Sequence, residues 1–210
     1  MATDGDVERV VEAIRAGRPV LLPTDTVYGL VTSAARAEYT WGLYDLKGRD
    51  RAQPTALLAA SVEDLFACVP ELRAGAGAIS NELIINELLP GPYTLVLPNP
   101  AQRYSWLTGT RPDAIGVRVA DLPELAARVV GAVSCVTATS ANEPGEPSAA
   151  TLDDVPGRIR AACAAELDVG PLTGRPSTVI DFTGAEPVVI RDGAASAADA
   201  IARVRRVLAA

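Results

Sequence analysis

Three basic side chains lie within five residues of one another in a chain whose formal net charge is -7. They are Lys47, Arg49 and Arg51, and the apolar run 56–60 follows them. This order predicts a helix that ends in a cationic loop and is followed by a buried strand. Guanidinium groups on such a loop can hold a polyanion through paired hydrogen bonds, and a lysine adds a point charge. A solvated turn is the alternative for an isolated K-x-R pattern.

Hydroxyl groups and single arginines gather at the ends of other predicted strands. Arg118 falls inside an apolar run, where burial of its charge requires an anionic partner, either a carboxylate of the chain or a bound ligand. The hydroxyl groups can cap helices and complete turns, or they can contact a ligand. The clusters are Thr24 with Thr26, Thr137 to Ser148, and Ser177 with Thr178, and the second arginine is Arg191.

The composition restricts the chemistry. Acidic residues outnumber basic ones 26 to 19, which excludes a general nucleic-acid binder and leaves room only for a local anion site. There is no histidine, which excludes His-dependent catalytic triads, and the three cysteines form no CxxC pair, so neither zinc nor a disulfide framework is indicated. The N-terminus shows no signal peptide and no run is long enough for a membrane span, so we expect a cytoplasmic protein.

The periodicity predicts an α/β fold with a mixed sheet in a single domain over residues 1–210. We expect a strand, a hydroxyl-rich turn and a helix around residues 19–30, which is the form of a ligand-binding junction, and a flexible turn at 74–78. The predicted helices are 6–16, 36–46, 62–66, 79–89, 122–130, 159–165 and 197–208. The predicted strands are 19–22, 56–60, 93–97, 115–119, 132–136, 167–169, 177–181 and 187–191.

Six motifs in register resemble the YrdC-type threonylcarbamoyl-AMP synthases, in their short form without an additional C-terminal domain. Each motif is weak alone, but their order and spacing match over residues 6–196. They are Pro23 to Leu30 (PTDTVYGL), Lys47 to Arg49, Pro90 to Leu97 (PGPYTLVL), Gly116 to Val119, Ser140 to Asn142 (SAN), and Pro176 to Asp181 (PSTVID).

This resemblance implies a YrdC-like twisted mixed sheet with flanking helices and a concave, locally positive cavity. It also implies a nucleotidyltransferase that joins L-threonine, bicarbonate and ATP, with Mg2+ on the phosphates, to give threonylcarbamoyladenylate and pyrophosphate. The product would pass to a downstream tRNA threonylcarbamoyl transferase complex, which modifies adenosine next to the anticodon. Some contact with double-stranded RNA is implied as well.

The resemblance also assigns roles to residues, with no metal ligand among them. On the nucleotide side it implies that catalysis involves Lys47, Arg49, Ser140 and Asn142, and that ATP is bound by Arg49, Gln53, Ser140, Ser148 and Arg191. On the other side it implies that L-threonine is bound by Thr26, Arg118, Ala138 (through its backbone) and Ser177. The pattern stops before Arg51, which we expect to be a solvated charge.

Two other functions stay open at this point. The first is a catalytically divergent YrdC-like protein that binds nucleotide or RNA without forming the adenylate. The second is the carbamoyl-adenylate activity of the YrdC-like module in hydrogenase-maturation carbamoyltransferases, although nothing resembling the other modules of those proteins is present.

Overall fold

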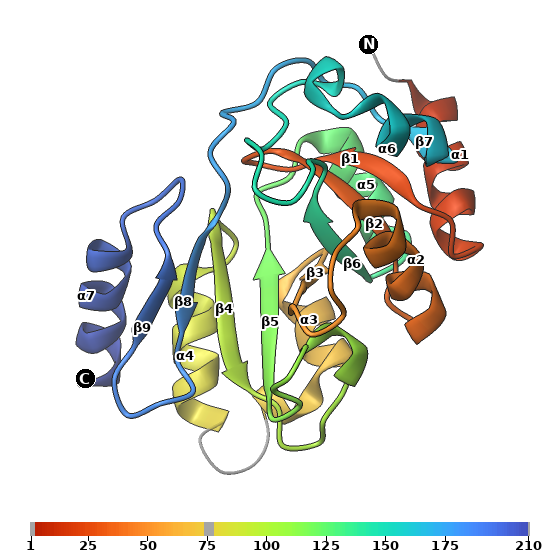
Figure 1. Ribbon diagram of the computed structural model, residues 1–210. Coiled ribbons are helices and arrows are strands. Elements are labelled where there is room, and N and C mark those ends of the chain that lie inside the picture. Colours follow the sequence, from red (N-terminus) through yellow and green to blue (C-terminus); the bar gives the residue numbers. More distant parts are fainter. Residues whose placement is uncertain (1–2, 74–77, 210) are drawn as a thin grey trace.

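Short apolar runs in the sequence form the strands of one twisted sheet in the computed structural model, which describes residues 3–73 and 78–209 (Figure 1). Within these residues nine strands pair in the order β7-β1-β2-β6-β3-β5-β4-β8-β9. The strands are β1 (Val20–Pro23), β2 (Tyr28–Ser33), β3 (Ala56–Ala59), β4 (Tyr93–Pro98), β5 (Ala114–Val119), β6 (Cys135–Ser140), β7 (Ala165–Glu166), β8 (Thr178–Asp181) and β9 (Val188–Arg191).

The sheet is mixed, as predicted. β3 pairs parallel with β5, β4 with β8, and β1 with β7, whereas the remaining neighbours are antiparallel. The helices are α1 (Asp4–Arg15), α2 (Ala37–Lys47), α3 (Val62–Cys68), α4 (Ala78–Leu88), α5 (Glu124–Gly131), α6 (Gly157–Ala162) and α7 (Ala197–Leu208).

Three apolar clusters fix these helices on the sheet. One lies under α3, α4 and α7 and includes Leu57, Leu95 and Val117. A second lies under α1 and α5, and a third joins α2 and α6 to β1 and β2. Because burial of apolar surface is the main favourable term in folding, these clusters account for the positions of the helices.

Part of the sheet remains outside these clusters. Along β5, Gly116 and Arg118 are half-buried while their neighbours on either side are buried, so one face of the strand is open. Ala56 pairs with both Gly116 and Ala138 across the central strands, and all three are half-buried. A row of such small side chains leaves this part of the sheet incompletely covered, and we call this region, between Lys47 and Arg118, the cavity.

The predicted elements agree with the structure except near the hydroxyl-rich segments. The strand–turn–helix junction predicted around residues 19–30 is wrong, because Thr24 to Val27 form the turn of a hairpin between β1 and β2. β2 is buried on both faces, so its sequence lacks the alternation that marks a strand. The strand predicted at 132–136 instead runs from Cys135 to Ser140. No strand covers 167–169, and the helix predicted at 159–165 is observed as α6 (Gly157–Ala162), with β7 at Ala165–Glu166.

Two single segments complete the fold. Cys135 packs against an apolar cluster, and its Sγ lies 2.7 Å from that of Cys68. The turn predicted at 74–78 falls mostly outside the described residues. Within the described part of the chain, no helix combines the length and apolar character needed to cross a bilayer.

Candidate active site

The C-terminus of α2 presents two cations to one side of the sheet. α2 ends at Lys47, and Gly48 follows in the left-handed region with a φ of 63°. Glycine adopts this conformation without the steric cost that a Cβ would bring. The amide of Arg49 then donates to the carbonyl of Tyr44 over 2.8 Å, which closes the helix. The chain reverses at this cap, and both Lys47 and Arg49 reach β6.

Lys47 is the one lysine in the sequence, and only 3% of it is exposed. Its Nζ donates to the Ser140 carbonyl oxygen over 2.5 Å, and it lies 3.5 Å from Ser140 Oγ and 3.4 Å from Asn142 Oδ1. The Asn142 amide is held in turn by the carbonyls of Glu143 and Glu146. The structure therefore brings together the K-x-R and S-A-N motifs, which lie more than ninety residues apart.

The acceptors around Lys47 are all neutral. Burial is the main reason that the pKa of Lys47 is lowered to about 8, and the positive charge of Arg49 lowers it further. An ammonium group in this position is stabilised by a bound anion, because the anion offsets the cost of its burial.

Arg49 lies beside Lys47 and joins β6 to the segment before β3. Its guanidinium donates to Thr139 Oγ1 over 3.2 Å and to the Pro54 carbonyl oxygen, and it lies 5.7 Å from the centre of the Tyr44 ring. Its Nε is buried without a partner within the described residues. Arg49 is thus fixed in place, and a fully buried N–H is left without an acceptor.

The other residues predicted on the nucleotide side are less enclosed. Gln53 is exposed, and its backbone carbonyl accepts a hydrogen bond from the Tyr44 hydroxyl over 3.0 Å. Ser148 is half-buried. Arg51 is exposed, lies 3.3 Å from Asp45 and stacks on Trp41, so it points away from Lys47 and Arg49 and agrees with the predicted solvated charge.

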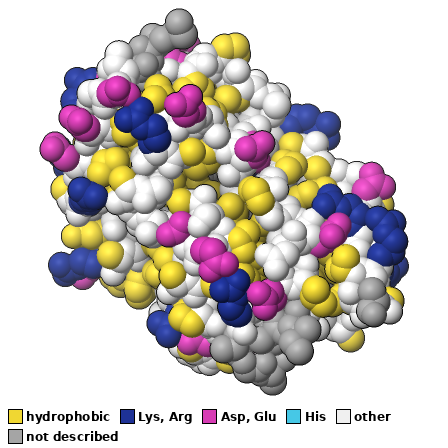
Figure 2. All heavy atoms as spheres, turned by 180° about the vertical axis from the view of Figure 1, so that it is seen from behind, with side chains coloured by type: hydrophobic (Ala, Val, Ile, Leu, Met, Phe, Trp, Pro, Cys, Tyr) yellow, Lys and Arg dark blue, Asp and Glu magenta, His cyan; other side chains and the backbone are white. Residues whose placement is uncertain are grey.

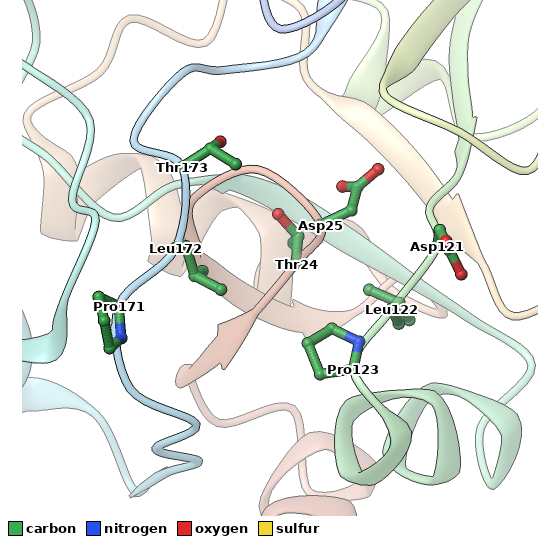
Figure 3. Close-up of a pocket in the computed structure, with 8 residues that line it drawn as sticks. All are labelled: Thr24, Asp25, Asp121, Leu122, Pro123, Pro171, Leu172 and Thr173. Atoms are coloured by element: carbon green, nitrogen blue, oxygen red, sulfur yellow. The ribbon is translucent and has the colours of Figure 1, made fainter.

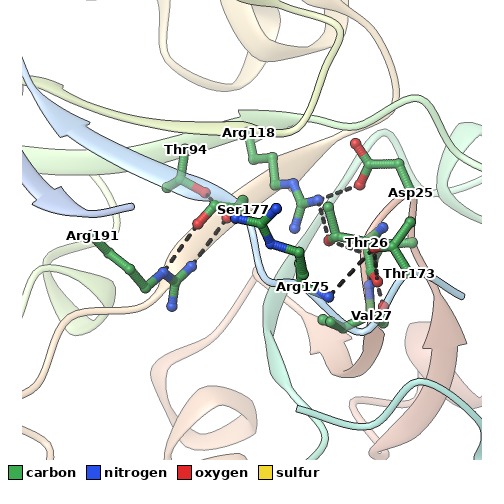
Figure 4. A network of polar contacts seen from close by, with 10 residues as sticks. Asp25, Thr26, Val27, Thr94, Arg118, Thr173, Arg175, Ser177 and Arg191 are labelled. Atoms are coloured by element: carbon green, nitrogen blue, oxygen red, sulfur yellow. Dashed lines mark hydrogen bonds and ion pairs between the residues drawn. The ribbon is translucent and has the colours of Figure 1, made fainter. Parts of the chain in front are cut away.

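Arg118 belongs to a second polar network, which includes Asp25 and Thr26 (Figure 4), and we refer to it as the other side of the cavity. Its Nη2 donates to Thr26 Oγ1 over 2.8 Å and to Asp25 Oδ1, and the Arg118 and Asp25 side chains are each only 11% exposed. The sequence left open whether the anionic partner of Arg118 is a carboxylate of the chain, and Asp25 is that carboxylate.

Ser177 and Arg191 are joined by hydrogen bonds, and Arg191 lies near both sides, since the charges of Arg118 and Arg49 both act on it. Arg191 donates from Nε to the Ser177 carbonyl over 3.0 Å and from Nη2 to the Ser177 hydroxyl over 3.2 Å. The Ser177 hydroxyl also lies 2.9 Å from that of Thr94. Gly193 permits this arrangement, because a Cβ there would lie 2.2 Å from the Pro176 carbonyl oxygen.

The arginines of the cavity influence one another electrostatically. Loss of solvent around the Arg191 guanidinium lowers its pKa, and the charges of Arg118 and Arg49 lower it further. Burial lowers the pKa of Arg118 as well, against the opposing effect of Asp25, and it raises the pKa of Asp25. Arginine stays protonated despite such shifts. The cavity is therefore positive locally, although the chain as a whole is acidic.

Two contributors to the site were not predicted. Asp25 pairs with Arg118, and Thr139 accepts a hydrogen bond from Arg49. For Asp25 the sequence held a signal, because it is the acidic residue within the Thr24–Thr26 cluster and an arginine inside a strand needs a counter-ion. For Thr139 no such signal existed among the many hydroxyl groups of residues 137–148.

An open groove of about 710 Å³ adjoins Asp25 on its other side (Figure 3). It runs between the β1–β2 turn, the segment after β5 and the chain before β8. Its lining residues are Thr24, Asp25, Asp121, Leu122, Pro123, Pro171, Leu172 and Thr173.

Known proteins with similar sequences are named as threonylcarbamoyl-AMP synthases, some of them as putative ones. A Mycobacterium tuberculosis protein is 32% identical over 187 residues, which cover 89% of this chain and 83% of that protein. The Vibrio campbellii threonylcarbamoyl-AMP synthase is 29% identical over 188 residues, which cover 89% of this chain and 98% of that protein.

Solved structures agree in fold. The crystal structure of Pyrococcus abyssi Sua5 complexed with L-threonine matches 99% of this chain with a TM-score of 0.84 and 28% identity. This chain spans 58% of the length of that archaeal chain. The Escherichia coli YciO structure matches with a TM-score of 0.78 at 23% identity and covers 93% of both chains, which supports the fold.

The family model for Sua5, YciO and YrdC, described as telomere recombination, matches residues 12–193. The match covers most of the chain, and it includes every position that the sequence predicted for the site. Both the predicted family and the predicted twisted mixed α/β sheet are confirmed. The chain belongs to the Sua5/YciO/YrdC family.

Proposed function

We propose that this protein is a threonylcarbamoyl-AMP synthase, an enzyme that joins L-threonine, bicarbonate and ATP and releases pyrophosphate and water. The observation that carries the proposal is the buried contact of Lys47 with Ser140 and Asn142, beside Arg49. Relatives named threonylcarbamoyl-AMP synthase support it.

The nucleotide fits the side of the cavity that holds Lys47 and Arg49. Their present acceptors are neutral oxygens, so phosphate oxygens can replace these acceptors and form stronger, charge-assisted hydrogen bonds. Ser140 and Asn142 lie within reach of the same groups. Arg191, Gln53 and Ser148 are assigned to the outer part of the nucleotide site.

L-threonine fits the opposite side, where Arg118 is the partner for its carboxylate. Thr26 offers a hydroxyl group to that arginine, and Ser177 offers one that accepts a hydrogen bond from Arg191. The backbone of Ala138 lies on the floor between the two sides, and its carbonyl accepts a hydrogen bond from the Thr55 hydroxyl over 2.9 Å. The Pyrococcus abyssi protein, by its description, was crystallised with L-threonine.

The proposed reaction has two steps. The threonine amine combines with bicarbonate to form a carbamate and water. A carbamate oxygen then attacks the α-phosphorus of ATP, and the bond to pyrophosphate breaks. Both steps gather negative charge, so a cavity with fixed cations lowers the barrier by positioning and electrostatic stabilisation. Within the described residues no three acidic, histidine or cysteine side chains gather, and Mg2+ fits as an ion carried by the phosphates.

The product is proposed to pass to a tRNA threonylcarbamoyl transferase complex in the cytoplasm. Any RNA contact would be local, because the chain is acidic overall. On the face opposite to that of Figure 1, acidic and basic side chains are interspersed (Figure 2).

One assay tests the proposal. The purified protein is incubated with ATP, Mg2+, bicarbonate and L-threonine, and pyrophosphate and the adenylate are measured by coupled spectrophotometry and mass spectrometry. We expect both products, with pyrophosphate release that depends on threonine. ATP binding without any adenylate would contradict the proposal and favour the nucleotide-binding alternative.

A further inference from the structure

The Arg118 guanidinium is anchored through one of its three nitrogens. Nη2 donates to Asp25 and to Thr26, Nε is fully buried without a partner, and Nη1 donates to none of the described residues. Nη1 is therefore not fully buried, unlike Nε. The anchoring therefore determines which edge of the guanidinium a ligand meets.

Asp25 is itself held on a short, fixed turn. The Thr24 hydroxyl accepts hydrogen bonds from the amides of Thr26 and Val27, over 3.2 Å and 3.1 Å, and donates to the Val27 carbonyl over 2.7 Å. A turn closed by side-chain hydrogen bonds on both sides of Asp25 fixes the backbone that carries the carboxylate. The orientation of Arg118 thus follows from local bonds within four residues of the β1–β2 hairpin.

The contact between Asp25 and Arg118 also changes the net charge around Arg118. Arg118 lies close enough to Arg191 for its charge to lower the pKa of Arg191, and Arg49 lowers it further. Asp25 is the carboxylate that pairs with Arg118 in the described part of the chain. The Asp25–Arg118 pair is close to neutral, whereas Lys47, Arg49 and Arg191 contact only neutral oxygens.

We propose that Asp25 is a positioning residue that orients Arg118 toward the carboxylate of the amino-acid substrate and keeps phosphate groups out of that subsite. The inference rests on the proposed function and extends it. A single carboxylate competes poorly with a polyphosphate for an unpaired arginine, because attraction grows with ligand charge. With its charge offset by Asp25, Arg118 retains an N–H donor for a carboxylate but loses its excess attraction for pyrophosphate.

The test uses Asp25→Asn, which keeps an acceptor for Arg118 and removes the charge. L-threonine and magnesium pyrophosphate are titrated separately into the folded protein by calorimetry. We expect the Kd for threonine to rise at least about 10-fold and the Kd for pyrophosphate to fall about 3-fold or more. An unchanged Kd for threonine, or a weakening of both ligands by the same factor, would overturn the proposal, since the latter is the result of a merely structural role.

Asp121→Asn is the matched control. Asp121 lines the groove beside Asp25 but is exposed, and its carboxylate forms no ion pair with Arg118 in the described structure. Both dissociation constants should stay at wild-type values. If wild-type protein fails to bind threonine at all, the proposed function is at fault rather than the role of Asp25.

Asp25→Glu separates the two effects and replaces Asp25→Asn if that variant does not fold. The charge is kept but displaced by one methylene, so pyrophosphate should bind as in wild type while threonine binds several-fold more weakly. Wild-type affinity for threonine in Asp25→Glu would contradict the positioning role.

Discussion

The basic side chains on the two sides of the cavity differ in whether a carboxylate pairs with them. On one side Lys47 and Arg49 contact carbonyl, hydroxyl and amide oxygens, and no carboxylate pairs with either in the described residues. On the other side Arg118 pairs with Asp25. The positive charges of Lys47 and Arg49 are therefore not offset by a carboxylate. The charge of Arg118 is offset almost completely by that of Asp25.

This difference matches the ligands assigned to each side. A triphosphate carries several negative charges, and unpaired cations bind it well. A free amino acid carries one positive and one negative charge, so it needs directed hydrogen bonds more than net charge. The contrast therefore explains how an acidic protein could bind ATP and threonine side by side without exchanging their sites.

The largest effect is expected from Lys47→Met, which removes the charge and keeps the volume. Without the ammonium group, kcat/KM for ATP should fall by about 10³-fold or more, because charge-assisted bonds to the phosphates are lost. Threonine affinity, measured by calorimetry, should change less than about 3-fold, since Arg118 is untouched.

Arg51→Met is the matched control for this change. Arg51 lies four residues along the chain, pairs with the exposed Asp45 and points away from the cavity. The kcat/KM for ATP of the Arg51→Met variant should remain at the wild-type value. Equal losses in Lys47→Met and Arg51→Met would mean that the loop acts through its general charge, and the contrast between the two sides would not hold.

A second, smaller effect is expected from Arg118→Lys. The charge is kept, but an ammonium group cannot bond to Asp25 and Thr26 and still present a planar edge to the ligand. The KM for threonine should rise about 10- to 100-fold with ATP affinity unchanged. Steady-state kinetics with each substrate varied in turn would measure the split, and a parallel rise in both KM values would contradict it.

The comparison also explains what could be predicted from sequence. The motifs that contain Lys47, Ser140 and Asn142 were expected to lie together, and these three side chains are in contact, while their role in a site stays a prediction. Asp25 was overlooked because its role appears only when β5 lies beside the β1–β2 turn, a contact of residues more than ninety positions apart. The sequence indicates that Arg118 needs a counter-ion and offers Asp25 as one acidic residue, but it does not show that the two are neighbours.

The elements show the same limit. Amphipathic helices such as α1 and α7 were predicted within two residues, because one apolar stripe faces the sheet and periodicity reveals it. Strand β2 was not predicted, because both of its faces are buried and its sequence shows no alternation of apolar and polar residues. The cavity itself depends on small residues in register, Ala56 beside Gly116 and Ala138, and register cannot be read from one strand alone.

The pH dependence offers a third, milder test of the contrast. The pKa of Lys47 lies at about 8 in the free protein, so its charge is present below that pH and is lost as the pH rises through it. The Kd for ATP should therefore be flat between pH 6.5 and about 7.5 and then rise up to about 10-fold by pH 9. Threonine binding should not share this step. In Lys47→Met the step for ATP should disappear, and its persistence would assign the titration to another group.

The smallest expected effect comes from Gly193→Ala, which tests how firmly the threonine side is held by its backbone. The new Cβ would lie 2.2 Å from the Pro176 carbonyl oxygen and 2.4 Å from the Ser177 carbonyl carbon, so residues 176 and 177 must move. We expect a loss of about 1–3 kcal/mol in stability and a several-fold rise in the KM for threonine, because Ser177 carries the bonds to Arg191. The KM for ATP should rise less, since Lys47 and Arg49 are fixed by α2 and β6. A larger rise for ATP than for threonine would place Ser177 on the nucleotide side and reverse the assignment of the two subsites.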